Sequence, residues 1–282
     1  MSAPGQLSMN DGVVYPGLPP TSDIERLDTM HNTIARYFGR ELGPAPLDGM
    51  HPSKIMELGC GTGAWAIQTA KQFPDAQVVA VDQSSLPDRI LPPNLKFHRA
   101  DVTQKLEFED ETFDIVHARL VLIHVVDGPG TLLRASRLVK PGGLLLIEDL
   151  DWTSLAESGG PATWQAVYKF KEIQDRRGVD VGFGKKIEAT MTSLDIFSDI
   201  QAKKISIPFG ATIDANGSEE SFQLFSLGMK KSILEFMGHV STRLHDQGLT
   251  HELVRECDKE QERCDNESVI DMYFCWARRS VE

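Results

Sequence analysis

Short apolar stretches alternate with helical patterns along the chain from residue 54 onward. Most of these stretches are hydrophobic at consecutive positions and end in polar or glycine-rich residues, which is typical of strands buried on both faces of a parallel sheet. Between them, apolar residues recur every three or four positions, as on one face of a helix. The alternation predicts an α/β domain. The expected strands are 54–58, 77–82, 95–99, 113–117 and 144–148, and the expected helices are 64–73 and 129–138.

Ser22 and Glu25 have the spacing of a capping box, which predicts a helix that begins there and ends near Gly39. The residues before it are rich in proline and glycine, so we expect an irregular segment. We therefore divide the chain into an N-terminal lid segment with its helix (1–45) and a main domain (46–282).

The last part of the chain is expected to be mostly helical. Two further strands are indicated by alternating polar and apolar residues or by β-branched and aromatic residues, which brings the expected sheet to seven strands. A stretch at about 210–262 reads as a helical cap inserted between these strands, with breaks where glycines occur. These remaining elements are helices at 162–177 and 185–197, strands at 204–209 and 269–277, and helical breaks at Gly228, Gly238 and Gly248.

Composition narrows the possible partners. The formal net charge is -12, from 41 acidic and 29 basic residues, so a phosphate backbone would be repelled and nucleic acid is not expected as a partner. No apolar run approaches the roughly 20 residues of a membrane helix, and no membrane association is expected. The four cysteines form no C-x-x-C pair, which predicts no metal site and indicates reduced thiols in the cytoplasm, with the nucleus as an alternative.

A glycine-rich turn, Gly59-Cys60-Gly61-Thr62-Gly63, joins the first expected strand to the first expected helix. Such a turn lets a ligand approach the backbone, and the helix behind it offers free N–H groups. The pattern also fits the dinucleotide fingerprint, with Ala64 at its last position. Taken alone, the turn therefore leaves a nicotinamide oxidoreductase open.

Two acidic residues near this turn bear on the choice between a nicotinamide cofactor and S-adenosylmethionine. Glu57 stands just before the first glycine, where it suits a cationic ligand such as the sulfonium nucleoside S-adenosylmethionine better than a pyrophosphate. Asp82 ends the second strand, where an acidic side chain can accept hydrogen bonds from both ribose hydroxyls. Asp82 supports a nucleoside site without choosing between the two cofactors.

Five motifs in order, over roughly residues 54–150, resemble those of class I S-adenosylmethionine-dependent methyltransferases. Further segments resemble the fungal LaeA-like methyltransferases, a group of tailoring enzymes and regulators of secondary metabolism. The class I motifs are Ile55–Gly63, Val81-Asp82, Arg99–Val102, Phe113–Arg119 and Leu138–Gly143; the narrower likeness rests on Glu25–His31, Gly63–Ala66 and Leu91–Phe97.

The resemblance implies a Rossmann-like, doubly wound sheet of seven strands with the last antiparallel, capped by helices. It also implies S-adenosylmethionine as cofactor. Glu57, Gly59 and Gly61 would border its methionine part, and Asp82 its ribose. The remaining implied cofactor contacts are Asp101 at the adenine amino group, the Val102 backbone beside it, the His117 main chain at the amino group of the methionine part, and the neighbouring Gly63 and Gln83.

The acceptor side is less determined. His124 lies just after the fourth strand and is the candidate general base; the alternative interpretation is a partly buried structural histidine. Asp149 could line an acceptor pocket or cap a loop, and Trp152 could stack on a flat acceptor or pack in the core. Tyr15 and His31 belong to the segment that, in the resembling family, folds over the cofactor as a lid.

We therefore expect methyl transfer by in-line displacement to a small-molecule acceptor, a secondary metabolite. The alternative is a LaeA-like regulatory protein that acts through protein partners. The protein is expected to be a monomer or a homodimer.

Overall fold

The computed structural model describes residues 15–210, 220–263 and 265–281, so residues 1–14 of the N-terminal lid segment and residues 211–219 near the start of the expected cap lie outside the described residues. One sheet contains all seven strands in the order β3-β2-β1-β4-β5-β7-β6. The strands are β1 (Lys54–Leu58), β2 (Gln77–Asp82), β3 (Leu95–Arg99), β4 (Phe113–Arg119), β5 (Val139–Asp151), β6 (Phe197–Pro208) and β7 (Val269–Arg279).

Strands β1 to β5 run parallel to one another, and β7 runs antiparallel to both β5 and β6. Six strands therefore share one direction and the last opposes them, which confirms the predicted sheet. The helices are α1 (Ile24–Tyr37), α2 (Ala64–Gln72), α3 (Gly128–Leu138), α4 (Trp152–Ser158), α5 (Pro161–Asp175), α6 (Ile187–Ser193), α7 (Glu220–Leu244) and α8 (His251–Gln261), with short 3-10 helices η1 (Pro20–Ser22), η2 (Leu122–His124), η3 (Phe183–Lys186) and η4 (His245–Gln247).

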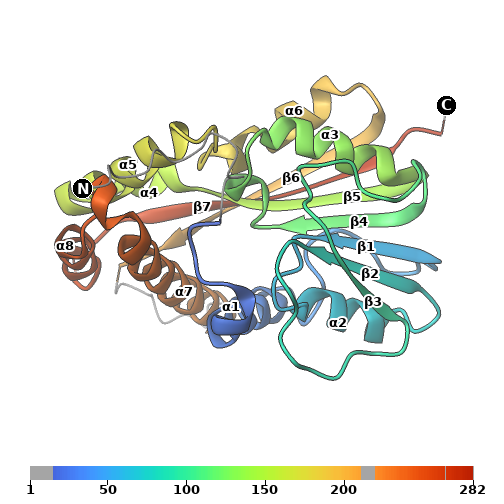
Figure 1. Ribbon diagram of the computed structural model, residues 1–282, viewed down its shortest axis with the longest axis horizontal. Coiled ribbons are helices and arrows are strands. Elements are labelled where there is room, and N and C mark those ends of the chain that lie inside the picture. The colour runs from blue at the N-terminus through green and yellow to red at the C-terminus, as the bar shows by residue number, and fades with distance from the viewer. Residues whose placement is uncertain (1–14, 211–219, 264, 282) are drawn as a thin grey trace, which may run out of the picture.

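Alternate residues of the central strands pack in two different cores. Val78 and Ala80 of β2 belong to the hydrophobic cluster on one face of the sheet, while Val79 and Val81 belong to the larger cluster on the other. Helix α2 lies on one face and α3 and α6 lie on the other, and α1 and α7 run side by side (Figure 1). Because both faces are covered, the apolar runs seen in the sequence are continuous and do not alternate. No helix among the described residues combines the length and the apolar character needed to cross a membrane.

The capping box at Ser22 and Glu25 is wrong. Helix α1 begins at Ile24 and follows Asp23, whose side chain caps no backbone N–H. Ser22 instead ends η1, where its N–H donates to the carbonyl of Pro19. The prolines at the start of this turn fix the backbone, and the Asp23 carboxylate pairs with Arg26 in the first turn of α1.

Two strand boundaries also differ from the expectation. Strand β5 extends from Val139 to Asp151, through a register shift that absorbs the glycines expected to form a turn, so Asp149 lies on the strand itself. Strand β6 begins at Phe197, whereas the preceding helix was expected to extend to residue 197 and the strand to begin only at 204. Its first half is an exposed edge whose pairing comes from the backbone of the long β7, so no hydrophobic alternation marks it in the sequence.

The expected helical breaks at Gly228 and Gly238 are wrong, because α7 is continuous through both. Gly228 allows close packing on α1: a Cβ there would lie 2.4 Å from Thr33 Oγ1. A Cβ at Gly238 would meet nothing within 4 Å. The real break comes at Gly248, which has a positive φ of 97° after η4.

These two glycines give a matched pair of substitutions. Gly228→Ala should lower the free energy of unfolding by about 1–3 kcal/mol, because the methyl group overpacks the α1–α7 contact. Gly238→Ala should raise it by about 0.5–1 kcal/mol, because alanine favours the helix and has free space. Chemical denaturation of both variants measures the difference. Equal effects at the two sites would show that Gly228 does not set the spacing of these helices.

Candidate functional site

A cavity of about 720 Å³ lies at the carboxyl ends of β1, β2 and β4. Strand β1 sits between β2 and β4, so the chain leaves the sheet in opposite directions on the two sides of the β1–β4 pair. Open α/β sheets bind ligands at this switch point. The remaining walls come from residues 15–20, from α1 and from α7, which are brought over the strand ends by the packing of the two helices.

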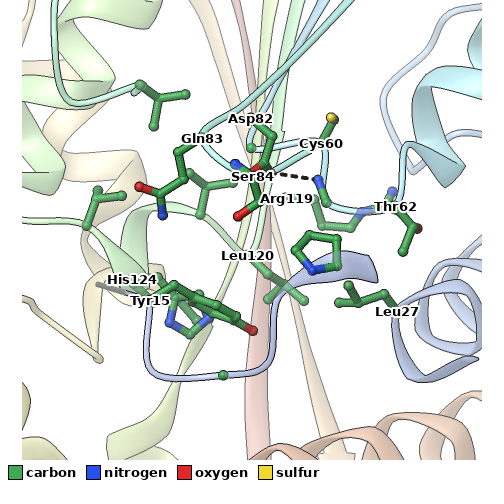
Figure 2. Close-up of a pocket in the computed structure, with 18 of the residues that line it drawn as sticks. Tyr15, Leu27, Cys60, Thr62, Asp82, Gln83, Ser84, Arg119, Leu120 and His124 are labelled. Carbon is green, nitrogen blue, oxygen red and sulfur yellow. Dashed lines mark hydrogen bonds between the residues drawn. The ribbon is translucent and has the colours of Figure 1, made fainter. Parts of the chain in front are cut away.

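The glycine-rich turn forms the floor of the cavity. Gly59 has a positive φ of 64°, and a Cβ there would lie 2.5 Å from Val121 Cγ2. The Asp82 carboxylate accepts hydrogen bonds from the Gly61 N–H at 2.9 Å and the Ser84 N–H at 2.8 Å (Figure 2). Asp82 therefore holds the turn and the end of β2 together, and burial raises the pKa of its carboxyl group.

Glu57 faces the first turn of α2. Its Oε2 accepts the Ala66 N–H at 3.0 Å, and its side chain is almost fully buried. Burial raises the pKa of Glu57 to about 8, even though Arg119 and the Ala66 N–H favour the carboxylate. A cation bound beside Glu57 would stabilise the charged form.

A buried polar network lies behind Glu57. The Arg119 guanidinium donates to the Glu148 carboxylate, to the Leu42 carbonyl at 2.8 Å and to His31 Nδ1 at 3.3 Å. Burial alone would raise the pKa of Glu148, but the Arg119 charge holds it below its usual value. The network joins β4, β5 and α1 beneath the cavity.

Two histidines are part of this network. His31 donates from Nε2 to Gln68 Oε1 at 2.9 Å while Nδ1 faces Arg119, and burial lowers its pKa to about 4. His117 stacks on Trp65 with the ring centroids 3.8 Å apart, and burial lowers its pKa to about 4 as well. Both imidazoles are neutral at physiological pH.

The other end of the cavity is lined by aromatic rings. The Tyr15 ring meets the His124 ring edge to face at 4.9 Å, and Phe236 lies 5.5 Å from His124 (Figure 2 shows Tyr15 and His124). The Trp152 ring lies 5.7 Å from Phe236. The Arg26 guanidinium stands 5.6 Å from the Phe236 ring and 3.5 Å from the Tyr15 hydroxyl. We call these five residues the aromatic cluster.

Most of the residues predicted from the sequence meet on the cavity wall. Three of them lie elsewhere: Gly63 is behind the wall, the His117 ring is in the core, and the Asp149 carboxylate is buried where it accepts the Leu122 N–H at 2.9 Å and supports η2. The predicted residues on the wall are Tyr15, His31, Glu57, Gly59, Gly61, Asp82, Gln83, Asp101, Val102, His124 and Trp152.

Sequence reasoning missed several wall residues. Arg26 and Arg119 lie inside segments that carried the resemblance. Arg119 stands out as a charge at the start of an apolar run, which was a usable signal, whereas Arg26 lies between acidic residues and does not stand out. Phe236 and Arg243 lie on α7, and nothing local distinguishes them from ordinary helix residues.

The wall fits a cationic nucleoside. Glu57, Asp82 and Asp101 place carboxylates along the strand ends, and the glycine turn leaves room for close approach to the backbone. The described residues include no group of three or more metal-ligating side chains arranged to hold a metal ion.

The shifted groups predict how stability depends on pH. The lowered pKa values of His31, His117 and His124 mean that the unfolded chain binds more protons between about pH 4 and 6.5, so stability rises with pH in that window. The raised pKa values of Glu57 and Asp149 have the opposite effect: the folded chain holds these protons more tightly than the unfolded chain, so stability falls as the pH rises. Stability should therefore fall from about pH 6.5 to 8.

Glu57→Gln should remove about 1–2 kcal/mol of that fall, because the neutral amide has no proton to lose. Urea unfolding at several pH values measures it, with the half-exposed Glu235→Gln as control. An unchanged slope above pH 6.5 in Glu57→Gln would contradict the assignment.

Comparison with known proteins agrees with this geometry. The methyltransferase domain family matches residues 29–180. Methyltransferase str2 of Strobilurus tenacellus is 34% identical over 254 residues, which cover 89% of this chain and 90% of that protein. Methyltransferase str3 of the same fungus is 40% identical over 203 residues, covering 70% of this chain and 72% of the relative.

The secondary metabolism regulator laeA of Coprinopsis cinerea is 33% identical over 134 residues, but these cover only 45% of this chain and 33% of the regulator. Among solved structures, phosphoethanolamine N-methyltransferase 2 of Haemonchus contortus, in complex with S-adenosylhomocysteine, shares the fold with a TM-score of 0.52 at 18% identity. That match covers 92% of this chain and 57% of the Haemonchus chain. The motifs, the switch-point cavity and these relatives together identify the chain as a member of the methyltransferase domain family and as an S-adenosylmethionine-dependent methyltransferase.

Proposed function

We propose that this methyltransferase acts on a small, largely apolar molecule, a secondary metabolite. The observation that carries the proposal is the aromatic cluster, which continues the cofactor end of the cavity and offers rings where an acceptor must lie. A flat or apolar molecule bound between such rings would be desolvated and oriented. Orientation matters most here, because correct alignment of the nucleophile can supply about 7–11 kcal/mol.

In this proposal the carboxylates of Glu57, Asp82 and Asp101 hold the cofactor. Asp82 would accept from the ribose while it keeps its hydrogen bonds to the backbone of the glycine turn. When bound, the cofactor supplies an electrophilic methyl group. The protein binds, orients and excludes water, and residues 15–20 cover the cavity from the side of α1 and α7.

His124 is well placed to contact the acceptor but poorly suited to remove its proton. Burial, together with the Arg26 charge, lowers the pKa of His124 to about 3. Transfer from a phenol with an ordinary pKa of about 10 would then cost about 10 kcal/mol. We propose that His124 orients the acceptor through its neutral ring.

The regulatory alternative is less supported. The likeness to the laeA protein covers less than half of this chain, whereas that to str2 extends over 89% of it.

The proposed function is tested by calorimetric binding of S-adenosylhomocysteine, followed by transfer of labelled methyl groups into a metabolite extract. We expect binding and a labelled small molecule. Binding without any labelled small molecule, together with a stable co-purifying protein, would favour the regulatory alternative instead.

Asp82→Ala should weaken S-adenosylhomocysteine binding at least tenfold, because hydrogen bonds to a carboxylate contribute about 1.5–3 kcal/mol each. Asp114→Ala is the matched control. Asp114 also accepts backbone N–H groups, from Ser53 and Lys54, but it lies near the start of β4 and does not line the cavity. Unchanged affinity in Asp82→Ala would refute the ribose assignment.

His124→Gln should lower kcat by less than tenfold with the acceptor found in the labelling experiment, because the amide keeps a polar contact in a similar place. Loss of a general base costs roughly 100-fold to 10,000-fold. A loss in that range, accompanied by disappearance of an ionisation from the pH–rate profile, would restore the base role.

A further inference from the structure

Charges are segregated along the cavity. The cofactor end carries the acidic side chains of Glu57, Asp82 and Asp101, and the Arg119 guanidinium on the same wall is paired with Glu148. Around the aromatic cluster, the charged residues on the cavity wall are Arg26 and Arg243, and no aspartate or glutamate within the described ranges lines that end. This is unexpected in a chain whose formal net charge is -12. A cation-binding end thus adjoins an end that favours an anion.

Arg26 is a fixed cation at the centre of this end. Its Nε donates to both Asp23 carboxylate oxygens, at 2.9 and 3.1 Å, and its Nη1 donates to Ser232 Oγ at 3.2 Å. Asp23 lies behind the wall and does not line the cavity. Arg26 therefore presents a rigid guanidinium face whose charge is largely compensated from behind.

Arg243 supplies charge that is not compensated. It extends from α7 across the residue 15–20 segment, and its Nη1 donates to the Tyr15 carbonyl at 3.1 Å. Its side chain is exposed, and no carboxylate pairs with it in the described parts of the chain. A carboxylate that enters the cavity beside Tyr15 could therefore accept a hydrogen bond from the Arg243 guanidinium.

The absence of an effective general base at His124 also favours an anionic acceptor. Nδ1 of His124 is buried without a hydrogen-bond partner among the described residues, and the lowered pKa of the ring makes it a weak proton acceptor. An acceptor that is already an anion needs no base. A carboxylic acid with an ordinary pKa near 4 is ionised at physiological pH, whereas a phenol with a pKa of about 10 is not.

We infer that the acceptor is a carboxylic acid on an apolar, aromatic-sized skeleton, that it binds as its carboxylate, and that Arg243 attracts it to the aromatic cluster. This inference rests on the proposed function. One carboxylate oxygen forms the new C–O bond to the methyl carbon while the C–S bond breaks, and the bonding pair stays on sulfur. The anion and the sulfonium become a neutral methyl ester and a neutral thioether, so no proton is released or required.

The first test compares three probes of nearly equal shape on the protein saturated with S-adenosylhomocysteine: 3-phenylpropionate, 3-phenylpropan-1-ol and 3-phenylpropylamine. Calorimetry at low ionic strength should show that the acid binds at least tenfold more tightly than the alcohol or the amine. Equal or tighter binding of either of the others, or no measurable binding of the acid, overturns the inference.

Variants on α7 separate charge from structure. Arg243→Gln should weaken binding of the acid at least fivefold and that of the alcohol less than twofold, while Arg243→Lys should keep most of the acid affinity. Lys231→Gln removes one positive charge from the same helix outside the cavity, so it should leave the acid affinity unchanged. If Arg243→Gln and Lys231→Gln lose the same amount of affinity for the acid, the loss is explained by the change in net charge, and the role of Arg243 is overturned.

The second test follows the product. Matched sets of aryl carboxylic acids and aryl alcohols are incubated with the enzyme and methyl-labelled S-adenosylmethionine, and mild base then releases label from esters as methanol. We expect base-labile label from the acids; base-stable label confined to the alcohols would overturn the inference. Binding of S-adenosylhomocysteine is measured on every variant. If the protein does not bind S-adenosylhomocysteine, the proposed function fails. If it binds S-adenosylhomocysteine but not the acid, this inference alone fails.

Discussion

The ion pair between Arg119 and Glu148 is the interaction on which the site depends. The carboxyl ends of β1, β4 and β5 bring Glu57, His117 and Glu148 together in a region sealed from water, where an uncompensated charge would cost several kcal/mol. Arg119 compensates Glu148 and thereby leaves Glu57 as the group that is free to meet a cation.

Helix α1 extends this network to the rest of the cavity. Three polar residues on it contact three different parts of the site: His31 accepts from Arg119 beneath the cavity, Asp28 accepts from Thr62 of the glycine turn at 2.5 Å, and Arg26 stands in the aromatic cluster. Asp28 also accepts from Arg89 at 2.9 Å in the segment that follows β2. The Glu25–His31 segment is thus a shared wall, and the cofactor end and the acceptor end are positioned by one rigid element.

The two ends of the cavity differ in the sign of the charge that they can bind. Acidic side chains at one end and guanidinium groups at the other are held by hydrogen bonds before any ligand arrives, so little reorganisation is needed during the reaction. This arrangement suits a transfer in which positive charge disappears from the donor. It also accords with our proposal that His124 orients the acceptor, since burial beside Arg26 keeps its ring neutral.

Local patterns in the sequence predicted the seven strands, the glycine turn and the acidic residues at the strand ends, although the bounds of β5 and β6 differ from the expectation. These features depend on local signals: apolar runs of strand length, a turn that needs glycine at Gly59, and Asp82 at the end of a strand. The tertiary structure alone decided which distant residues complete the cavity. Phe236 and Arg243 reach it because Gly228 lets α7 pack closely on α1, and burial, which is a property of the folded chain, sets the protonation of Glu57 and His124. No local pattern carries such information, because desolvation and pairing arise only when segments far apart in the chain are brought into contact.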